Sequence, residues 1–139
     1  RQNIASSYRM GIELQGSYIF NNWLQVQGNL AISRNKIASF TEFIDNFDTG
    51  NQESIEHRGT DIAFSPNVVG GLTFDAQITR GLTASWIQKY VGRQYLDNTQ
   101  NASRSLNPFW VNDLRINWKI ASKWWKDASM TLQVNNLFN

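Results

Sequence analysis

The chain lacks cysteine, and this absence excludes disulfide bridges, thiolate metal sites and thiol catalysis. Histidine is nearly as scarce, because His57 is the single histidine among 139 residues. A histidine-based triad or a multi-histidine metal site therefore has little material, and no G-x-S-x-G motif is present. We predict that the chain is not an enzyme, and that it holds no cofactor and no metal.

Long apolar runs are also missing, since no stretch approaches about 18 consecutive apolar residues, so a transmembrane helix is not expected. The first residues show no charged segment followed by an apolar one, so a signal peptide is not expected; it was removed, or the chain is an internal fragment. Charged residues make up only 17%, below the roughly 25% of soluble domains. The net charge of +2 is scattered without a run of like charges, which argues against a nucleic-acid partner.

Alternation of apolar and polar residues is the main signal in the sequence, and it indicates β-strands whose successive side chains lie on opposite faces. Even-numbered positions carry the apolar side chains in every extended stretch, with Ile19 as an exception. Three hairpins are predicted, and they give about six long antiparallel strands. Their even-numbered apolar residues include Met10, Ile12, Leu14, Leu24, Val26, Leu30, Leu72, Phe74, Ile78, Leu82, Trp86, Leu114, Ile116, Met130, Leu132 and Val134.

The connections between these strands differ in length at the two ends of the predicted sheet. Two-residue turns are expected at Asn21-Asn22 and Arg80-Gly81, and a third short connection over residues 122–127. The other connections, residues 41–63 and 95–107, are far longer than usual hairpin loops. One end therefore has short turns and the other has long loops, which is the layout of outer-membrane barrels, with turns in the periplasm and loops outside.

A soluble antiparallel sandwich alternates in the same way, so a β-sandwich carbohydrate-binding module remains an alternative. Three features favour a membrane: strands of about 10 to 17 residues, longer than soluble strands; polar faces rich in Gln, Asn, Ser and Thr; and aromatic residues near both strand ends. An outer-membrane hydrolase on a smaller barrel is the enzymatic alternative. The aromatic residues near the ends are Phe20, Trp23, Trp118, Trp124 and Trp125 at one end, and Phe40, Phe64, Tyr90, Phe109 and Trp110 at the other.

Six strands cannot close such a barrel, because single-chain bacterial barrels begin at about eight strands and an open edge in lipid leaves backbone groups unpaired. We therefore expect an all-β, antiparallel up-and-down meander that is a fragment of a larger transmembrane β-barrel. On this reading even-numbered residues face lipid and odd-numbered residues face the lumen. Lys123 and Lys126, with the two tryptophans between them, are expected to anchor the periplasmic interface.

Four segments resemble parts of TonB-dependent receptors. They are residues 11–14 (GIEL), 61–66 (DIAFSP), 91–99 (VGRQYLDNT) and 134–139 (VNNLFN). Their order and spacing extend the resemblance over nearly the whole chain, and the segment after Tyr95 is similar to receptors of Bacteroidetes in particular.

The resemblance implies a 22-stranded barrel around a plug, of which residues 1–139 form one part without the plug domain, the TonB box or the final strand. It also implies an outer-membrane location in a Gram-negative bacterium. The implied function is import of a scarce nutrient, namely a ferric siderophore, cobalamin or a glycan. The implied partners are outer-membrane lipid, the rest of the barrel and its plug, and the TonB complex through regions outside this chain.

Candidate ligand-binding residues lie in the two long connections, where loops carry function on a rigid scaffold. The first connection is acidic, yet its carboxylates do not follow the calcium-loop pattern. It also has unusual apolar content, for which packing within the loop is the alternative explanation. The candidates are Phe43, Phe47, His57, Asn98, Asn101 and Arg104.

Overall fold

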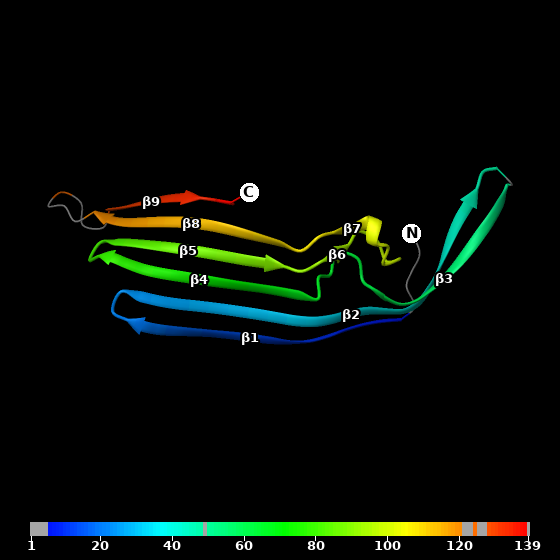
Figure 1. The fold of residues 1–139 in the computed structure, drawn as a ribbon, viewed down its shortest axis with the longest axis horizontal. Helices are drawn as coiled ribbons and strands as arrows, with labels where there is room; N and C mark the ends of the chain where they lie inside the picture. Colours follow the sequence, from blue (N-terminus) through cyan, green and yellow to red (C-terminus); the bar gives the residue numbers. More distant parts are fainter. Residues whose placement is uncertain (1–5, 49, 121–123, 125–127, 139) are drawn as a thin grey trace. The chain divides into compact units, whose positions relative to one another are not determined.

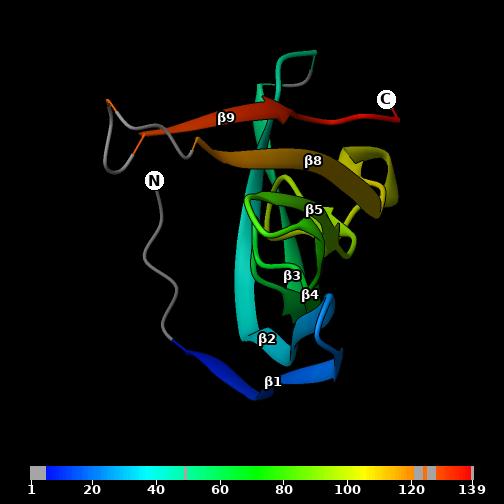
Figure 2. The ribbon, with the colours of Figure 1, turned by 90° about the vertical axis from the view of Figure 1, so that its left-hand side faces the viewer.

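The computed structural model describes residues 6–48, 50–120, 124 and 128–138, and strands dominate them (Figure 1, and Figure 2 in a view turned by 90°). Within these residues no helix is long and apolar enough to span a membrane. The main sheet has the order β1-β2-β4-β5-β8-β9, with β3 paired to β2, which confirms the antiparallel meander of six long strands. The elements are β1 (Ser7–Asn21), β2 (Leu24–Asn46), β3 (Asn51–Asp61), β4 (Val68–Thr79), β5 (Leu82–Val91), β6 (Gln94–Tyr95), the 3-10 helix η1 (Ala102–Arg104), β7 (Ser105–Leu106), β8 (Phe109–Ile120) and β9 (Ala128–Val134).

The chain divides into two compact units. The strand unit comprises Glu13–Ala31, Val68–Val91 and Phe109–Asn139, and so holds β4, β5, β8, β9 and parts of β1 and β2. The hairpin unit comprises Arg1–Ile12, Ile32–Asn67 and Gly92–Pro108. It contains the paired ends of β2 and β3 and the small two-stranded sheet of β6 and β7.

Strand pairing in the strand unit keeps even-numbered residues beside even-numbered residues. Phe74 pairs with Trp86, and Trp86 pairs with Leu114, while Ile116 pairs with Leu132 on β9. Because side chains alternate along each strand, the even-numbered residues of β4, β5, β8 and β9 share one face. We call this the even face and the opposite one the odd face.

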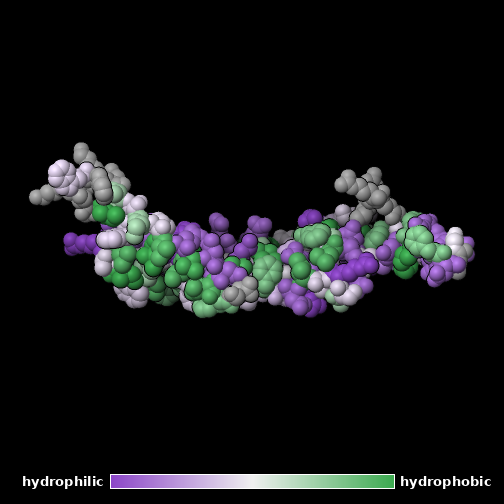
Figure 3. Space-filling view, turned by 90° about the horizontal axis from the view of Figure 1, so that it is seen from above, coloured by the Kyte–Doolittle hydropathy of each residue, from purple (hydrophilic) through white to green (hydrophobic). Residues whose placement is uncertain are grey.

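The even face is apolar and exposed. Trp118 is 48% exposed and Leu132 is 58% exposed, values that single large apolar side chains reach on many surfaces but that here recur along every strand. Figure 3 shows hydrophobic side chains gathered on one side of the strands and hydrophilic ones on the other. The alternation of apolar and polar residues in the sequence therefore produces one apolar and one polar surface.

A β-bulge keeps the two faces separate across the turn at Arg80-Gly81. Beside this turn Thr79 pairs with Leu82, an odd-numbered residue with an even-numbered one. The register then shifts between Gln77 and Thr79, so that Gln77 pairs with Thr83. The extra residue of the bulge restores the even-to-even pairing, because one added residue changes which face each side chain occupies.

The first turn lies one residue later than predicted, at Asn22 and Trp23, because β1 continues to Asn21. The side-chain oxygen of Asn21 accepts hydrogen bonds from the backbone N–H groups of Trp23, at 3.0 Å, and Leu24, at 2.9 Å. This is an Asx turn, in which the asparagine side chain takes the place of a backbone acceptor. The prediction of a tight hairpin is correct, and its position at Asn21-Asn22 is wrong.

The long connection predicted over residues 41–63 is largely a hairpin instead of a loop. β2 continues to Asn46 and pairs with β3 from Lys36–Asp61 to Asn46–Asn51. Gly50 supplies a left-handed backbone with φ of +68° in the turn. The register joins even-numbered residues of β2 to odd-numbered residues of β3, as in the pair Phe40–His57, so the parity rule reverses in β3.

The second long connection, over residues 95–107, also carries structure of its own. Gln94 pairs with Leu106 and Tyr95 with Ser105, so that β6 and β7 form a short ladder around η1. Folding of this connection back on itself satisfies backbone groups that an open loop would leave to water.

Candidate functional site

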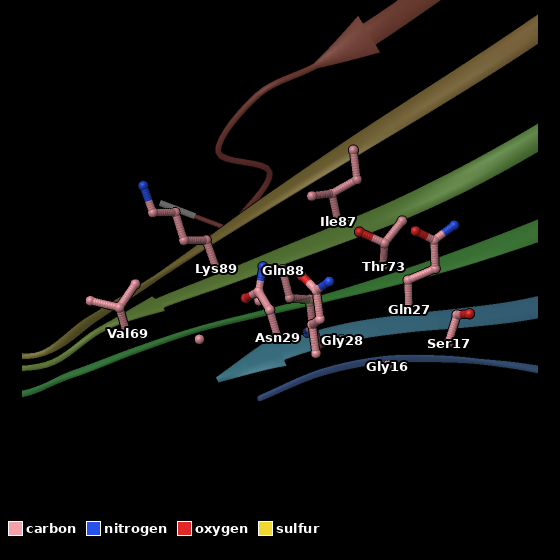
Figure 4. Close-up of a pocket in the computed structure, with 13 residues that line it drawn as sticks. Gly16, Ser17, Gln27, Gly28, Asn29, Val69, Thr73, Ile87, Gln88 and Lys89 are labelled. Carbon is pink, nitrogen blue, oxygen red and sulfur yellow. The ribbon is translucent and has the colours of Figure 1, made fainter. Parts of the chain in front are cut away.

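A polar trough of about 630 Å³ lies on the odd face of the strand unit. Figure 4 shows Ser17, Gln27, Thr73, Ile87 and Lys89 projecting to the same side from four neighbouring strands. The remaining lining residues are Gln15, Gly16, Gly28, Asn29, Val69, Gly70, Gly71 and Gln88. The hollow thus lies on the polar side of the wall, as expected of a lumen.

Hydrogen bonds order the floor of this face. The Gln27 side-chain amide donates to Asp75 at 3.4 Å, and the Ser85 hydroxyl donates to the same carboxylate at 2.5 Å. Asp75 therefore joins β2, β4 and β5 through side chains as well as through the backbone ladder.

The side chains of the trough are suited to binding a polar ligand. Its side chains offer amide and hydroxyl groups with one ammonium, Lys89, and they contain no paired carboxylates suited to acid-base catalysis. Among the described residues no group of three or more His, Asp or Glu side chains could hold a metal ion. The odd-numbered polar residues in the sequence indicate this face, whereas the predicted candidate residues all lie in the long connections and none lines the trough.

His57, one of the predicted candidates, is held within the hairpin unit. Its ring stacks on Phe40 with centroids 4.9 Å apart, and its Nε2 lies 2.8 Å from a Glu42 carboxylate oxygen. The carboxylate and the aromatic ring fix the imidazole on one face of the hairpin. His57 therefore serves first as an internal contact.

Four acidic residues of the hairpin each have a polar or charged partner within it. Besides Glu42, Asp45 accepts a hydrogen bond from Gln52, Glu53 accepts one from Asn46, and Glu56 pairs with Arg58. The hydrogen bond from Arg58 lowers the pKa of the Glu56 carboxyl and raises that of the guanidinium.

Asn98, Asn101 and Arg104 come together in the second connection, and each has a partner there. Asn98 accepts a hydrogen bond from the backbone N–H of Ala63 at 2.9 Å, and Asn101 caps η1 by accepting from the Ser103 N–H at 3.0 Å. The Arg104 guanidinium lies 3.0 Å from Asp97. Hydrogen bonds from Thr99, and then the contact with Arg104, lower the pKa of the Asp97 carboxyl.

Phe43 and Phe47 are the two phenylalanine candidates, and both side chains are exposed. Phe43 is 55% exposed on β2, and Phe47 is 94% exposed in the hairpin turn. Exposed aromatic groups on a connection can contact a ligand at little ordering cost, so both stay candidates.

Two of the segments that carry the family resemblance contact each other in the hairpin unit. The Phe64 N–H donates to the Tyr95 carbonyl at 2.9 Å, and the Asp61 N–H donates to the Gln100 side chain at 3.2 Å. Beneath them Asp61, only 7% exposed, lies 2.8 Å from Lys36. Residues 61–66 and 91–99 therefore brace one another, which their separation in the sequence does not reveal.

The predicted interfacial anchor lies mostly outside the described residues, which include Trp124 but not Lys123, Trp125 or Lys126. Trp124 itself is 91% exposed, as a side chain that meets an interface would be.

Comparison with known proteins agrees with this architecture. The family model for the TonB dependent receptor-like β-barrel matches residues 1–137. No curated protein and no solved structure matches the chain. The chain belongs to the β-barrel family of TonB-dependent receptors, outer-membrane transporters of Gram-negative bacteria.

Proposed function

We propose that this chain forms part of the wall and of the extracellular connections of a receptor that imports a scarce nutrient, namely a ferric siderophore, cobalamin or a glycan. The complete receptor has a barrel of about 22 strands around a plug. It takes energy from the TonB complex through regions outside this chain. The resemblance of residues 95–99 supports an origin in Bacteroidetes.

The polar trough on the odd face is the observation that carries this proposal. An import barrel needs a wetted inner wall that offers many weak hydrogen bonds and no strong trap, because cargo must both enter and leave. Gln27, Asn29 and Thr73 supply such groups, and Lys89 adds one positive charge. Hydroxyl, carbonyl and carboxylate groups of the three nutrient classes all match these donors and acceptors.

The lengths of the connections indicate how the strands are oriented in the outer membrane. Short turns at Asn22-Trp23 and Arg80-Gly81 lie at one end of the strands, and the β2–β3 hairpin and the β6–β7 connection leave the other end. Outer-membrane barrels place short turns in the periplasm and long connections outside. Phe43, Phe47 and His57 on the hairpin, and Asn98, Asn101 and Arg104 in the braced loop, are therefore the proposed extracellular contacts for cargo.

Uptake by the receptor that carries this chain tests the proposal. Cells that produce Gln27→Trp, Thr73→Trp or the double variant are compared with wild type for uptake of a labelled ferric siderophore, cyanocobalamin and an oligosaccharide. The bulky rings narrow the trough, so uptake of the transported member falls, most in the double variant. Leu132→Trp, on the even face, is the matched control and leaves uptake unchanged.

Two results contradict the proposal. One is wild-type cells that take up none of the three classes faster than cells without the receptor. The other is trough variants that reach the outer membrane in normal amounts and transport at the wild-type rate.

A further inference from the structure

An apolar groove of about 390 Å³ lies on the even face of the strand unit, and the trough does not account for it. Gly16 on β1, Gly28 on β2 and Gly70 on β4 form its floor, and Leu72, Tyr90 and Trp110 stand at its sides. Three adjacent strands thus carry glycine on a face whose other positions are mostly large and apolar. The groove exists because three side chains are missing.

The spacing around the glycines shows which of them leave open space. A Cβ atom added at Gly16 would meet nothing within 4 Å. At Gly28 it would lie 3.0 Å from Leu72 Cδ2, and at Gly70 it would lie 3.4 Å from Leu30 Cδ1. The two leucines therefore lean over neighbouring glycines, and the hollow is open above Gly16.

A pair of aromatic rings bounds the groove on the side of β5 and β8. The rings of Tyr90 and Trp110 pack with centroids 4.9 Å apart and a tilt of 47°. Both residues lie near the strand ends from which the long connections leave. Aromatic residues at such positions mark the outer boundary of the hydrocarbon layer in membrane barrels, which places the groove just inside that boundary.

The lining offers an occupant dispersion contacts and almost no hydrogen bonds, and the volume lies within the roughly 300 to 1,000 Å³ of ligand sites. The groove is continuous with the apolar face that meets lipid in this family of outer-membrane barrels. A hydrocarbon chain suits both facts. We infer that the groove holds one acyl chain of a lipid of the outer leaflet, seated across β1, β2 and β4. This inference rests on the assignment of the even face to lipid.

Photo-cross-linking with a phospholipid tests it. The receptor that carries this chain is reconstituted in phosphatidylcholine vesicles containing a phosphatidylcholine with a diazirine on one acyl chain, and labelled residues are mapped by mass spectrometry. We expect labelling to concentrate at residues 14–16, 28–30 and 70–72, above the level on β9. Gly16→Leu fills the open space without a clash, so labelling at 28–30 and 70–72 falls to the β9 level, and Gly16→Val gives the same loss with a smaller side chain. Leu132→Phe, a matched increase in volume on β9, leaves groove labelling unchanged.

The possible results distinguish failure of the acyl-chain site from failure of the assignment of the even face to lipid. Labelling that is equal at the groove and on β9, or that survives both Gly16 variants in folded protein, overturns the groove and leaves the lipid-facing assignment intact. Labelling at Gln27 or Thr73 overturns both. An oligomer whose groove is shielded from the lipid probe, and which Gly16→Leu dissociates, shows that a protein surface is the occupant and also overturns the inference.

Discussion

The strand unit and the hairpin unit follow different rules, although β1 and β2 contribute to both. In the strand unit each residue number predicts a face, because the even face is apolar and the odd face is polar, the contrast expected of a wall between hydrocarbon and a lumen. In the hairpin unit the parity reverses between β2 and β3, and side chains such as Asn98 and Gln100 bind backbone groups of other segments. A strand with an apolar environment on one side and a polar one on the other must alternate apolar and polar residues. A strand with water on both sides need not alternate.

Arginine on the even face breaks the strand unit most severely. Leu72→Arg or Ile116→Arg places a charge in hydrocarbon and costs about 2 to 4 kcal/mol of barrel stability near the midplane. Thr73→Arg, on the odd face beside Leu72, faces a polar lumen and changes stability by less than about 0.5 kcal/mol. Urea unfolding of the receptor in liposomes measures the difference, and equal stability of the Leu72 and Thr73 variants contradicts the assignment of faces.

Two amide side chains occupy even-numbered positions, where most residues of the strand unit are apolar. Gln88 donates a hydrogen bond to Asn112 at 3.1 Å, and both residues have even numbers. Gln88→Leu leaves the Asn112 amide without this partner and costs about 1 to 3 kcal/mol, whereas Gln88→Leu with Asn112→Leu removes both polar groups and restores stability. The same unfolding assay tests this, and a double variant less stable than the single one would show that the amides serve another role.

Low pH should destabilise the hairpin unit before the strand unit. The lowered pKa of Asp97, held by Thr99 and Arg104, stabilises residues 97–104 above the ordinary carboxyl pKa of 3.8. That contribution is lost as the pH falls through the folded-state pKa, because protonation removes the charge that both partners bind. Hydrogen exchange between pH 6 and pH 3 should show earlier opening of this loop than of β4 and β5. Asp97→Asn should remove the pH dependence, and its persistence would point to another titrating group.

Much of the strand unit could be predicted from sequence, since alternation over ten or more residues fixes both strand and face. The turn at Arg80-Gly81 was also evident. The position of the first turn was not, because it depends on a side-chain hydrogen bond of Asn21. The β2–β3 hairpin does not follow from the sequence, because its apolar residues, such as Phe40 and Phe43, fall on both parities and give no alternation. The apolar content of the first connection indicates Phe43 and Phe47 as candidates. The partners of the other four candidates depend on the fold and cannot be predicted from the sequence; these four are Asn98, Asn101, Arg104 and His57.

Cysteine labelling tests the central claim of two faces most directly. The chain has no native cysteine, so single cysteines at Leu72, Thr73, Ile116 and Asn117 can be compared in the membrane-embedded receptor, with any cysteine elsewhere removed. A water-soluble, membrane-impermeant maleimide should label Thr73→Cys and Asn117→Cys, which face the lumen, and leave Leu72→Cys and Ile116→Cys unmodified until detergent is added and the protein is unfolded. Labelling of all four at similar rates in the intact membrane would contradict the account.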